Sequence, residues 1–325
     1  MGTAMGRLFG ILVALWSFAV SAVAEQYLTF SNDVLAAQVE ALFTPDRNFV
    51  DTKIAIDGIL DPTVDPHSLR AQFESYIKPL HAMLIGTRTD HDKLKVLRHF
   101  LYRPGNWNNN LPLAYDHSDP DAKILDHKFL GYLLRTRNGT CSTMPLLVTL
   151  VGRRIGLNMT LAYGPKHVLM KFKDSTGEHW NLEATSGAGY TRESYYRAQF
   201  HMTDKALANG IYLRTLNDEE TTAAMANFLL EWLMKNNRPE DAIIAATVIL
   251  NHDPKNVFAV LARGSSHTMI LRRDILSKYT KRSELTTDQL AYAEALSAAN
   301  FRDFSAAEAL GWTEQDDLKS KSMAP

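Results

Sequence analysis

The feature that most constrains this chain is an apolar segment, residues 140–156, after which the residue pattern changes from helical to extended. Its apolar positions have the spacing of one helix face: Met144, Leu147, Val148, Val151 and Ile155. Pro145 is tolerated only in a first turn, because its missing N–H has no intrahelical partner to lose there. Gly156 ends the helix. The sequence therefore predicts a core helix that begins at about residues 140–144.

The segment that follows, residues 159–185, has the pattern of strands separated by turns at 164–165 and around 174–176. One pairing gives a uniformly apolar face, with Val168 opposite Leu182. The same pairing sets His167 directly opposite Glu183, with Cβ atoms about 5 Å apart. The pattern thus predicts an imidazole beside a carboxylate.

The rest of the chain is predicted to be mainly helical, so the fold class is α+β. Residues 68–104 and 123–137 have helical patterns, separated by a long stretch of turn-forming residues. Beyond about residue 216 only helical patterns occur. We expect a mixed domain at 25–215 and an all-helical domain at 216–325.

The first 24 residues are typical of a secretory signal peptide. Arg7 precedes an apolar run, and Ala22 and Ala24 occupy the small-residue positions of a cleavage site before Glu25. A retained membrane anchor is the competing interpretation, because the apolar run nearly spans a bilayer. Cleavage predicts a periplasmic or secreted protein with no stable membrane anchor.

Charge and composition exclude some partners. The 35 basic and 36 acidic residues give a formal net charge of −1, which offers no reason to expect a nucleic acid partner. A metal site is conceivable around the "DHSDPD" and "LDH" segments, at His117, Asp119, Asp121, Asp126 and His127. No zinc-type spacing of histidines or cysteines occurs, so we expect a solvated loop there, no metal and no cofactor.

The only cysteine in 325 residues, Cys141, lies at the predicted helix start. A lone cysteine is a free thiol, an intermolecular partner or an inert buried residue. Acyl transfer by a thiol needs a thiolate, a base and a group that holds the base. A helix N-terminus stabilises the thiolate, His167 can serve as the base and Glu183 can orient it. Asn181, on the same strand face, is an alternative orienting residue.

An acyl-transfer site also needs N–H donors for the developing oxyanion. The backbone N–H of Cys141 is one candidate. A second donor could come from the loop that contains Trp107 and Asn108. These two residues are secondary candidates on loop placement alone.

Three segments, "GTCSTMPLLVTLVGRRIGL", "KHVLMKF" and "HWNLEAT", resemble the Cys, His and Asp motifs of the transglutaminase-like superfamily. The resemblance covers about residues 95–190. It implies a papain-like core, in which a helix with an N-terminal Cys packs on an antiparallel sheet. It assigns Cys141 as nucleophile, His167 as base and Glu183 as orienting acid. The chain has Glu where the family usually has Asp.

The "NHDPKN" region resembles a tetratricopeptide repeat, in which paired Ala-rich helices are stacked. The resemblance implies a helical C-terminal region that binds a protein partner or peptide segment.

Together these patterns predict an exported thiol enzyme that acts on amide bonds of a protein or peptide substrate, by hydrolysis or by amine exchange. The alternative is a non-catalytic protein-binding module on the same scaffold. A metal-dependent hydrolase is a third, weaker alternative.

Overall fold

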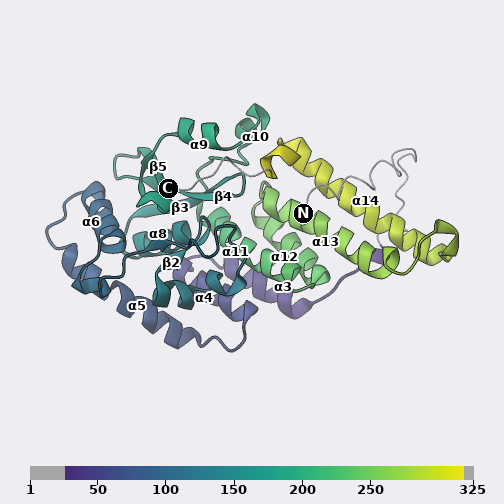
Figure 1. Ribbon diagram of the computed structural model, residues 1–325, viewed down its shortest axis with the longest axis horizontal. Helices are drawn as coiled ribbons and strands as arrows, with labels where there is room; N and C mark the ends of the chain where they lie inside the picture. The colour runs from purple at the N-terminus through teal and green to yellow at the C-terminus, as the bar shows by residue number, and fades with distance from the viewer. Residues whose placement is uncertain (1–25, 318–325) are drawn as a thin grey trace. The chain divides into compact units, whose positions relative to one another are not determined.

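The structure is a computed structural model that describes residues 26–317 (Figure 1). Its contacts divide the described residues into two compact units. The α+β unit comprises residues 42–202 and 212–228, and the helical unit comprises residues 26–41, 203–211 and 229–317. Two earlier segments, residues 26–41 and 203–211, thus group with the C-terminal helices. The predicted domains at 25–215 and 216–325 stay a prediction. The signal-peptide prediction concerns residues outside the described range.

The helices of the α+β unit are α4 (Phe49–Leu60), α5 (Pro66–Met83), α6 (Asp90–Tyr102), α7 (Leu130–Thr136), α8 (Thr143–Arg154) and α9 (Glu193–Gln199). Their starts follow from local sequence. The side chains of Asn48, Asp65 and Thr89 cap α4, α5 and α6 by accepting a free backbone N–H of the first turn.

The α+β unit contains an antiparallel sheet of four strands. Their order is β3 (Asn158–Gly164), β4 (His167–Lys173), β5 (His179–Glu183) and β6 (Gly189–Thr191). Helix α8 contacts β3 and β4 (Figure 1). A second, two-stranded parallel pair joins β1 (Ala114–Tyr115) to β2 (Asn138–Gly139), which ends two residues before Cys141. This arrangement is consistent with the predicted α+β class.

The register of β4 against β5 differs by two residues from the expected one. Met170, not Val168, pairs with Leu182. The reason is the turn, which runs from Asp174 to Glu178 and uses Gly177 in the left-handed region, with φ 90°. Because side chains alternate with a period of two, the shift leaves His167 and Glu183 on the same face.

Helix α8 is the buried centre of the α+β unit. It begins at Thr143, so Pro145 lies in the first turn as predicted. Every residue from Thr143 to Gly152 is buried, not only the predicted face, because helices and the sheet both pack against α8. A Cβ atom on Gly152 would lie 2.2 Å from the sulfur of Met159, so glycine permits the close approach of β3.

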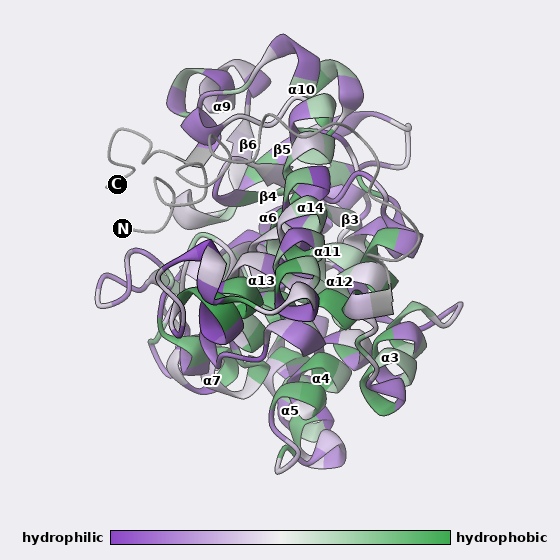
Figure 2. Cartoon of the chain, turned by 90° about the vertical axis from the view of Figure 1, so that its right-hand side faces the viewer, coloured by the Kyte–Doolittle hydropathy of each residue, from purple (hydrophilic) through white to green (hydrophobic). Residues whose placement is uncertain are grey.

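The helical unit contains α3 (Asp33–Glu40), α10 (Asp204–Asn209), α12 (Pro239–His252), α13 (Val257–Leu271) and α14 (Thr287–Leu310), and α11 (Asp218–Lys235) is divided between the units. Apolar residues are prominent on α12 and α13 (Figure 2). A buried cluster of this unit joins α12 and α13 to the turn after α13 and to α14, through Ile243, Ile270, Leu271, Ile275 and Leu296. The C-terminal part is thus helical, and its repeat character stays a prediction. Within residues 26–317 no helix has the length and apolarity needed to cross a bilayer.

Candidate active site

His167 and Glu183 form a buried hydrogen-bonded pair. His167 is the first residue of β4 and Glu183 is the last residue of β5, so the two lie at the same end of neighbouring strands. The Nε2 atom of the imidazole lies 2.8 Å from Oε2 of the carboxylate. Only 2% of the His167 side chain and 3% of the Glu183 side chain are exposed, so water cannot replace this contact.

The Glu183 carboxylate accepts hydrogen bonds on both oxygens. Oε1 accepts from the backbone N–H of Thr185 at 2.9 Å and from its hydroxyl at 2.6 Å. Oε2 accepts from the Tyr196 hydroxyl at 3.1 Å in addition to His167. Burial alone raises the pKa of Glu183, but the hydrogen bond and charge of His167, together with the Thr185 donors, bring the pKa below its usual value. The group is therefore a carboxylate at neutral pH.

The imidazole of His167 is held between its partners. Phe200 stacks on the ring, with centroids 5.3 Å apart and planes 23° apart. Because Nε2 binds Glu183, Nδ1 is the nitrogen left for the cysteine. Burial lowers the pKa of His167, but hydrogen bonds with Cys141 and Glu183 and the charges of both raise it to about 9. The imidazole is therefore protonated at neutral pH.

Cys141 lies two residues before α8 and is partly exposed. Its thiol points to the carbonyl of Lys166, the residue before His167, with a sulfur–oxygen distance of 3.9 Å. The local backbone is fixed by Thr140, whose N–H donates to the Thr143 hydroxyl at 2.8 Å. Within the described part of the chain, the N–H of Cys141 has no hydrogen-bond acceptor. Both the sulfur and a free donor are thus available to a ligand.

The turn that contains Cys141 requires glycine at position 139. A Cβ atom there would lie 2.7 Å from Cγ of Met144 and 3.1 Å from the hydroxyl of Thr143. A larger residue would therefore displace the start of α8, and with it the position of Cys141.

Comparison with known proteins gives one family match. Residues 67–227, which include α8 and the whole sheet, match the family model described as the transglutaminase-like superfamily. This part of the chain is a transglutaminase-like domain. A curated relative, a "UPF0162 protein" from Buchnera aphidicola subsp. Baizongia pistaciae (strain Bp), is 20% identical over 151 residues, or 46% of this chain. The chain spans about half the length of that relative, at 55%. No solved structure matches.

The secondary candidates of the transglutaminase-like domain have other partners. Asn181 accepts a hydrogen bond from the Lys171 ammonium at 2.5 Å. Trp107 donates its indole N–H to the Phe100 carbonyl at 3.1 Å, and Asn108 donates its amide to the Arg103 carbonyl at 2.7 Å. These contacts hold the loop after α6. The structure therefore brings together Cys141, His167 and Glu183, and gives the other three side chains local roles.

Several residues around the His167–Glu183 pair could not be predicted from the sequence pattern. Thr185, Tyr196 and Phe200 surround the His167–Glu183 pair but follow it in the chain, and only the folded path of β6 and α9 brings the latter two back. Tyr115 is another neighbour of Cys141, delivered by the β1–β2 pairing. Burial and the charge of Cys141, followed by the nearby aspartates, raise the pKa of Tyr115 to about 12.

The acidic segment considered for a metal forms a hydrogen-bonded loop. Asp116 lies 2.8 Å from Nδ1 of His127. Asp119 accepts the backbone N–H groups of Lys123 and Ile124, at 2.6 and 2.9 Å. Among the described residues, no three histidine, cysteine, aspartate or glutamate side chains are grouped as a metal would require.

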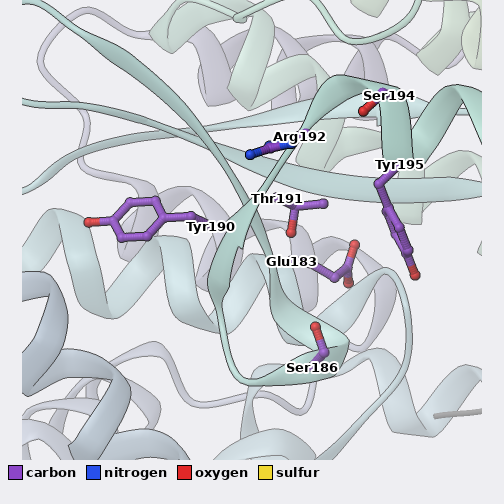
Figure 3. A pocket seen from close by; sticks show the side chains of 7 residues that line it. All are labelled: Glu183, Ser186, Tyr190, Thr191, Arg192, Ser194 and Tyr195. Atoms are coloured by element: carbon purple, nitrogen blue, oxygen red, sulfur yellow. The ribbon is translucent and has the colours of Figure 1, made fainter.

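An open cavity of about 460 Å³ lies over β6 and the start of α9 (Figure 3). Its lining is mostly polar: Glu183, Ser186, Tyr190, Thr191, Arg192, Ser194 and Tyr195. The side chain of Tyr190 extends away from the others in Figure 3. The cavity shares Glu183 with the site, but neither Cys141 nor His167 lines it.

Proposed function

We propose that the transglutaminase-like domain is a thiol-dependent acyl-transfer enzyme that acts on amide bonds of protein or peptide substrates. Cys141 is the nucleophile, His167 transfers protons, and Glu183 orients the imidazole. The observation that carries the proposal is the buried His167–Glu183 pair at 2.8 Å. Cys141 is near enough to help raise the pKa of the imidazole. This is the nucleophile, base and orienting group that thiol catalysis requires.

The protonation state of the pair suits the first step. A pKa of about 9 leaves His167 as an imidazolium at pH 7, beside the sulfur. A positive charge in contact with sulfur favours the thiolate, which is the reactive form. The N-terminus of α8, a helix of 12 residues, adds a favourable dipole at the same place.

In the first half-reaction the sulfur attacks the carbonyl carbon of an amide, and the electron pair of the C=O bond moves to oxygen. The free N–H of Cys141 is placed to donate to this oxyanion. The imidazolium of His167 gives its proton to the amide nitrogen, the C–N bond breaks, and an amine leaves. The product is a thioester on Cys141.

In the second half-reaction the now neutral imidazole removes a proton from water or from a second amine. That nucleophile attacks the thioester carbon, the C–S bond breaks, and the thiolate and imidazolium form again. Water as acceptor yields a carboxylic acid, and an amine yields a new amide. Glu183 holds the ring throughout by its bond to Nε2.

The setting of the enzyme is proposed from the sequence. Residues 1–24 have the pattern of a secretory signal peptide, so we propose export to the periplasm or the medium. The helical unit, with its resemblance to tetratricopeptide repeats, is proposed to bind the protein substrate or a partner protein.

Alkylation of the single cysteine tests the proposal. Wild-type protein and His167→Ala are treated with iodoacetamide at pH 6, and adduct formation is followed by intact mass. An ordinary thiol, with a pKa of about 8.5, is less than about 1% ionised at this pH. We expect the wild type to react roughly 100-fold faster than His167→Ala.

Equal and slow labelling of the two proteins would contradict the enzyme proposal. It would favour the alternative, a protein-binding module on a transglutaminase-like scaffold. If labelling is fast, a quenched amide peptide library with and without a primary amine distinguishes hydrolysis from amine exchange, because only exchange attaches the amine to the product.

A further inference from the structure

Tyr196 is a buried residue that the mechanism above does not use. It lies on α9, and none of its surface is exposed. Its hydroxyl is 3.1 Å from Oε2 of Glu183 and 3.5 Å from the carbonyl oxygen of Leu182. A phenol buried beside a carboxylate stays a neutral donor, because burial and the charge of Glu183 raise the pKa of Tyr196.

The hydrogen bond from Tyr196 goes to the same Glu183 oxygen that His167 contacts. The two Thr185 donors hold Oε1, whereas Tyr196 and His167 donate to the same oxygen, Oε2. Without Tyr196, that oxygen would have the imidazole as its only donor among these contacts. The hydroxyl therefore influences both the rotation of the carboxylate and the charge that Oε2 presents to His167.

The same short segment also contacts the imidazole itself. Phe200, the residue after α9, stacks on the His167 ring. Tyr196 and Phe200 are four residues apart, so they project from one side of the helix end. The segment thus holds the carboxylate with one side chain and the ring plane with the other.

We propose that Tyr196 is a positioning residue, whose hydroxyl shares Oε2 of Glu183 with His167 and thereby fixes the orientation and proton affinity of the imidazole. The inference rests on the proposed function of the site. It means that α9, through Tyr196, helps to set the orientation and proton affinity of His167. The Tyr196 ring also lies against the His167 ring, with centroids 6.1 Å apart, and Tyr196→Phe preserves that contact.

The expected direction follows from the groups that face this pair. Cys141 from the turn before α8, Glu183 from β5, and Phe200 after α9 surround His167. Glu183 is also faced by Thr185 and by Tyr102 of α6, whose hydroxyl donates to the Ala184 carbonyl at 2.8 Å. Loss of a neutral donor leaves more negative charge on Oε2 for the imidazolium. His167 then holds its proton to higher pH.

The test compares Tyr196→Phe with Tyr195→Phe, a matched control at an exposed residue of the same helix. The titration and tautomer of His167 are read from the ¹⁵N shifts of its ring in full-length protein. We expect Tyr196→Phe to raise the midpoint by about half a pH unit and to keep the Nε2–H tautomer above it. Alkylation of Cys141 at pH 6 should stay within about twofold of wild type, because the imidazole is protonated in both proteins at that pH. Tyr195→Phe should leave all three readouts unchanged.

An unchanged midpoint in Tyr196→Phe would overturn the inference, even if the variant were less stable. If Tyr196→Phe does not fold, site-specific 3,5-difluorotyrosine at position 196 keeps the ring and strengthens the donor, so the midpoint should fall. No fall would overturn the inference. Failure of the proposed function is a different result, slow alkylation of Cys141 in wild type and variants alike, and the ring titration still reports on Tyr196 in that case.

Discussion

Two buried histidines lie beside a carboxylate in this protein, one in each unit, and their protonation behaviour is opposite. In the α+β unit, the pKa of His167 is raised to about 9 beside Glu183. In the helical unit, the pKa of His267 is lowered to about 4 beside Asp303. At neutral pH the first is an imidazolium and the second is a neutral imidazole.

The difference lies in what else binds each carboxylate. Asp303 is bound by the guanidinium of Arg263 through Nη2 at 2.6 Å and Nε at 3.1 Å. His267 is only at 3.6 Å from Asp303, too far for a strong hydrogen bond. Burial is the main cause of the lowered pKa of His267, and the cations Arg263 and Arg302 add to it against the opposing charge of Asp303.

Glu183 has no arginine or lysine partner among its hydrogen bonds within the described residues. Its donors besides His167 are the neutral groups of Thr185 and Tyr196. The carboxylate charge therefore remains available to the imidazolium, with a cysteine on the ring's other side. A histidine next to an acid is a candidate for catalysis only when the acid is not already neutralised by a cation.

The largest predicted effect is on the reactivity of the Cys141 thiol, which should depend on His167 and not on His267. His167→Gln removes the positive charge beside sulfur, so alkylation of Cys141 at pH 6 should slow by roughly 100-fold. His267→Gln should leave the rate within about twofold of wild type. Stopped-flow labelling of both variants measures this. A large effect of His267→Gln would mean that the two sites are not independent.

A second prediction concerns stability. Asp303→Asn leaves the guanidinium of Arg263 without its counter-charge, and 28% of that side chain is exposed. The free energy of unfolding of the helical unit should fall by about 3 kcal/mol. Hydrogen exchange of the α13 and α14 amides reports on this unit. Conversely, Glu183→Gln should leave exchange in α13 and α14 unchanged, and faster exchange there would show that the units are coupled.

The third prediction is that the two histidines contribute to the free energy of unfolding in opposite pH ranges. The folded pKa of His267 lies below the unfolded value of about 6.5, so its stability contribution is present above pH 6.5 and is lost as pH falls toward 4. The loss should be about 2 kcal/mol near pH 4.5. The contribution of His167 is fully present below pH 6.5 and is lost as pH rises through 9.

Urea unfolding at pH 4.5, 7 and 9.5 measures the free energy of unfolding in both pH ranges. Hydrogen exchange of amides in α13 and in β4 shows which unit loses stability. His267→Gln should remove the acid-side loss, and His167→Gln should remove the alkaline-side loss. The same pH dependence in variant and wild type would contradict the assignment for that histidine.

Much of this site could be predicted from sequence because its signals are local. Pro145 and Gly156 delimit α8, and alternation of side chains keeps His167 and Glu183 on one face when the register shifts by two residues, as it does here. The register itself depended on the turn, where Gly177 adopts a positive φ that shifts the pairing by two residues. Such turn geometry is weakly encoded in the alternating pattern.

The rest depends on contacts between segments that are distant in sequence. Nothing in the local pattern of α9 links Tyr196 to Glu183. Likewise, α3 carries a helical pattern like any other, but its Asn32 cap bonds to Asp241 of α12 at 2.8 Å, within the helical unit. The grouping of α3 with the C-terminal helices depends on contacts of this kind, which neither helical pattern encodes.

The most direct test of the central claim is an NMR titration of the His167 ring in the wild type and in Cys141→Ala. The account predicts a midpoint near pH 9 in the wild type and a lower midpoint in Cys141→Ala, because the cysteine contributes to the raised pKa. His267 titrates near pH 4 in both and serves as the internal reference. A His167 midpoint at or below about 6.5, or one that Cys141→Ala leaves unchanged, would contradict the claim that sulfur, imidazole and carboxylate act as one unit.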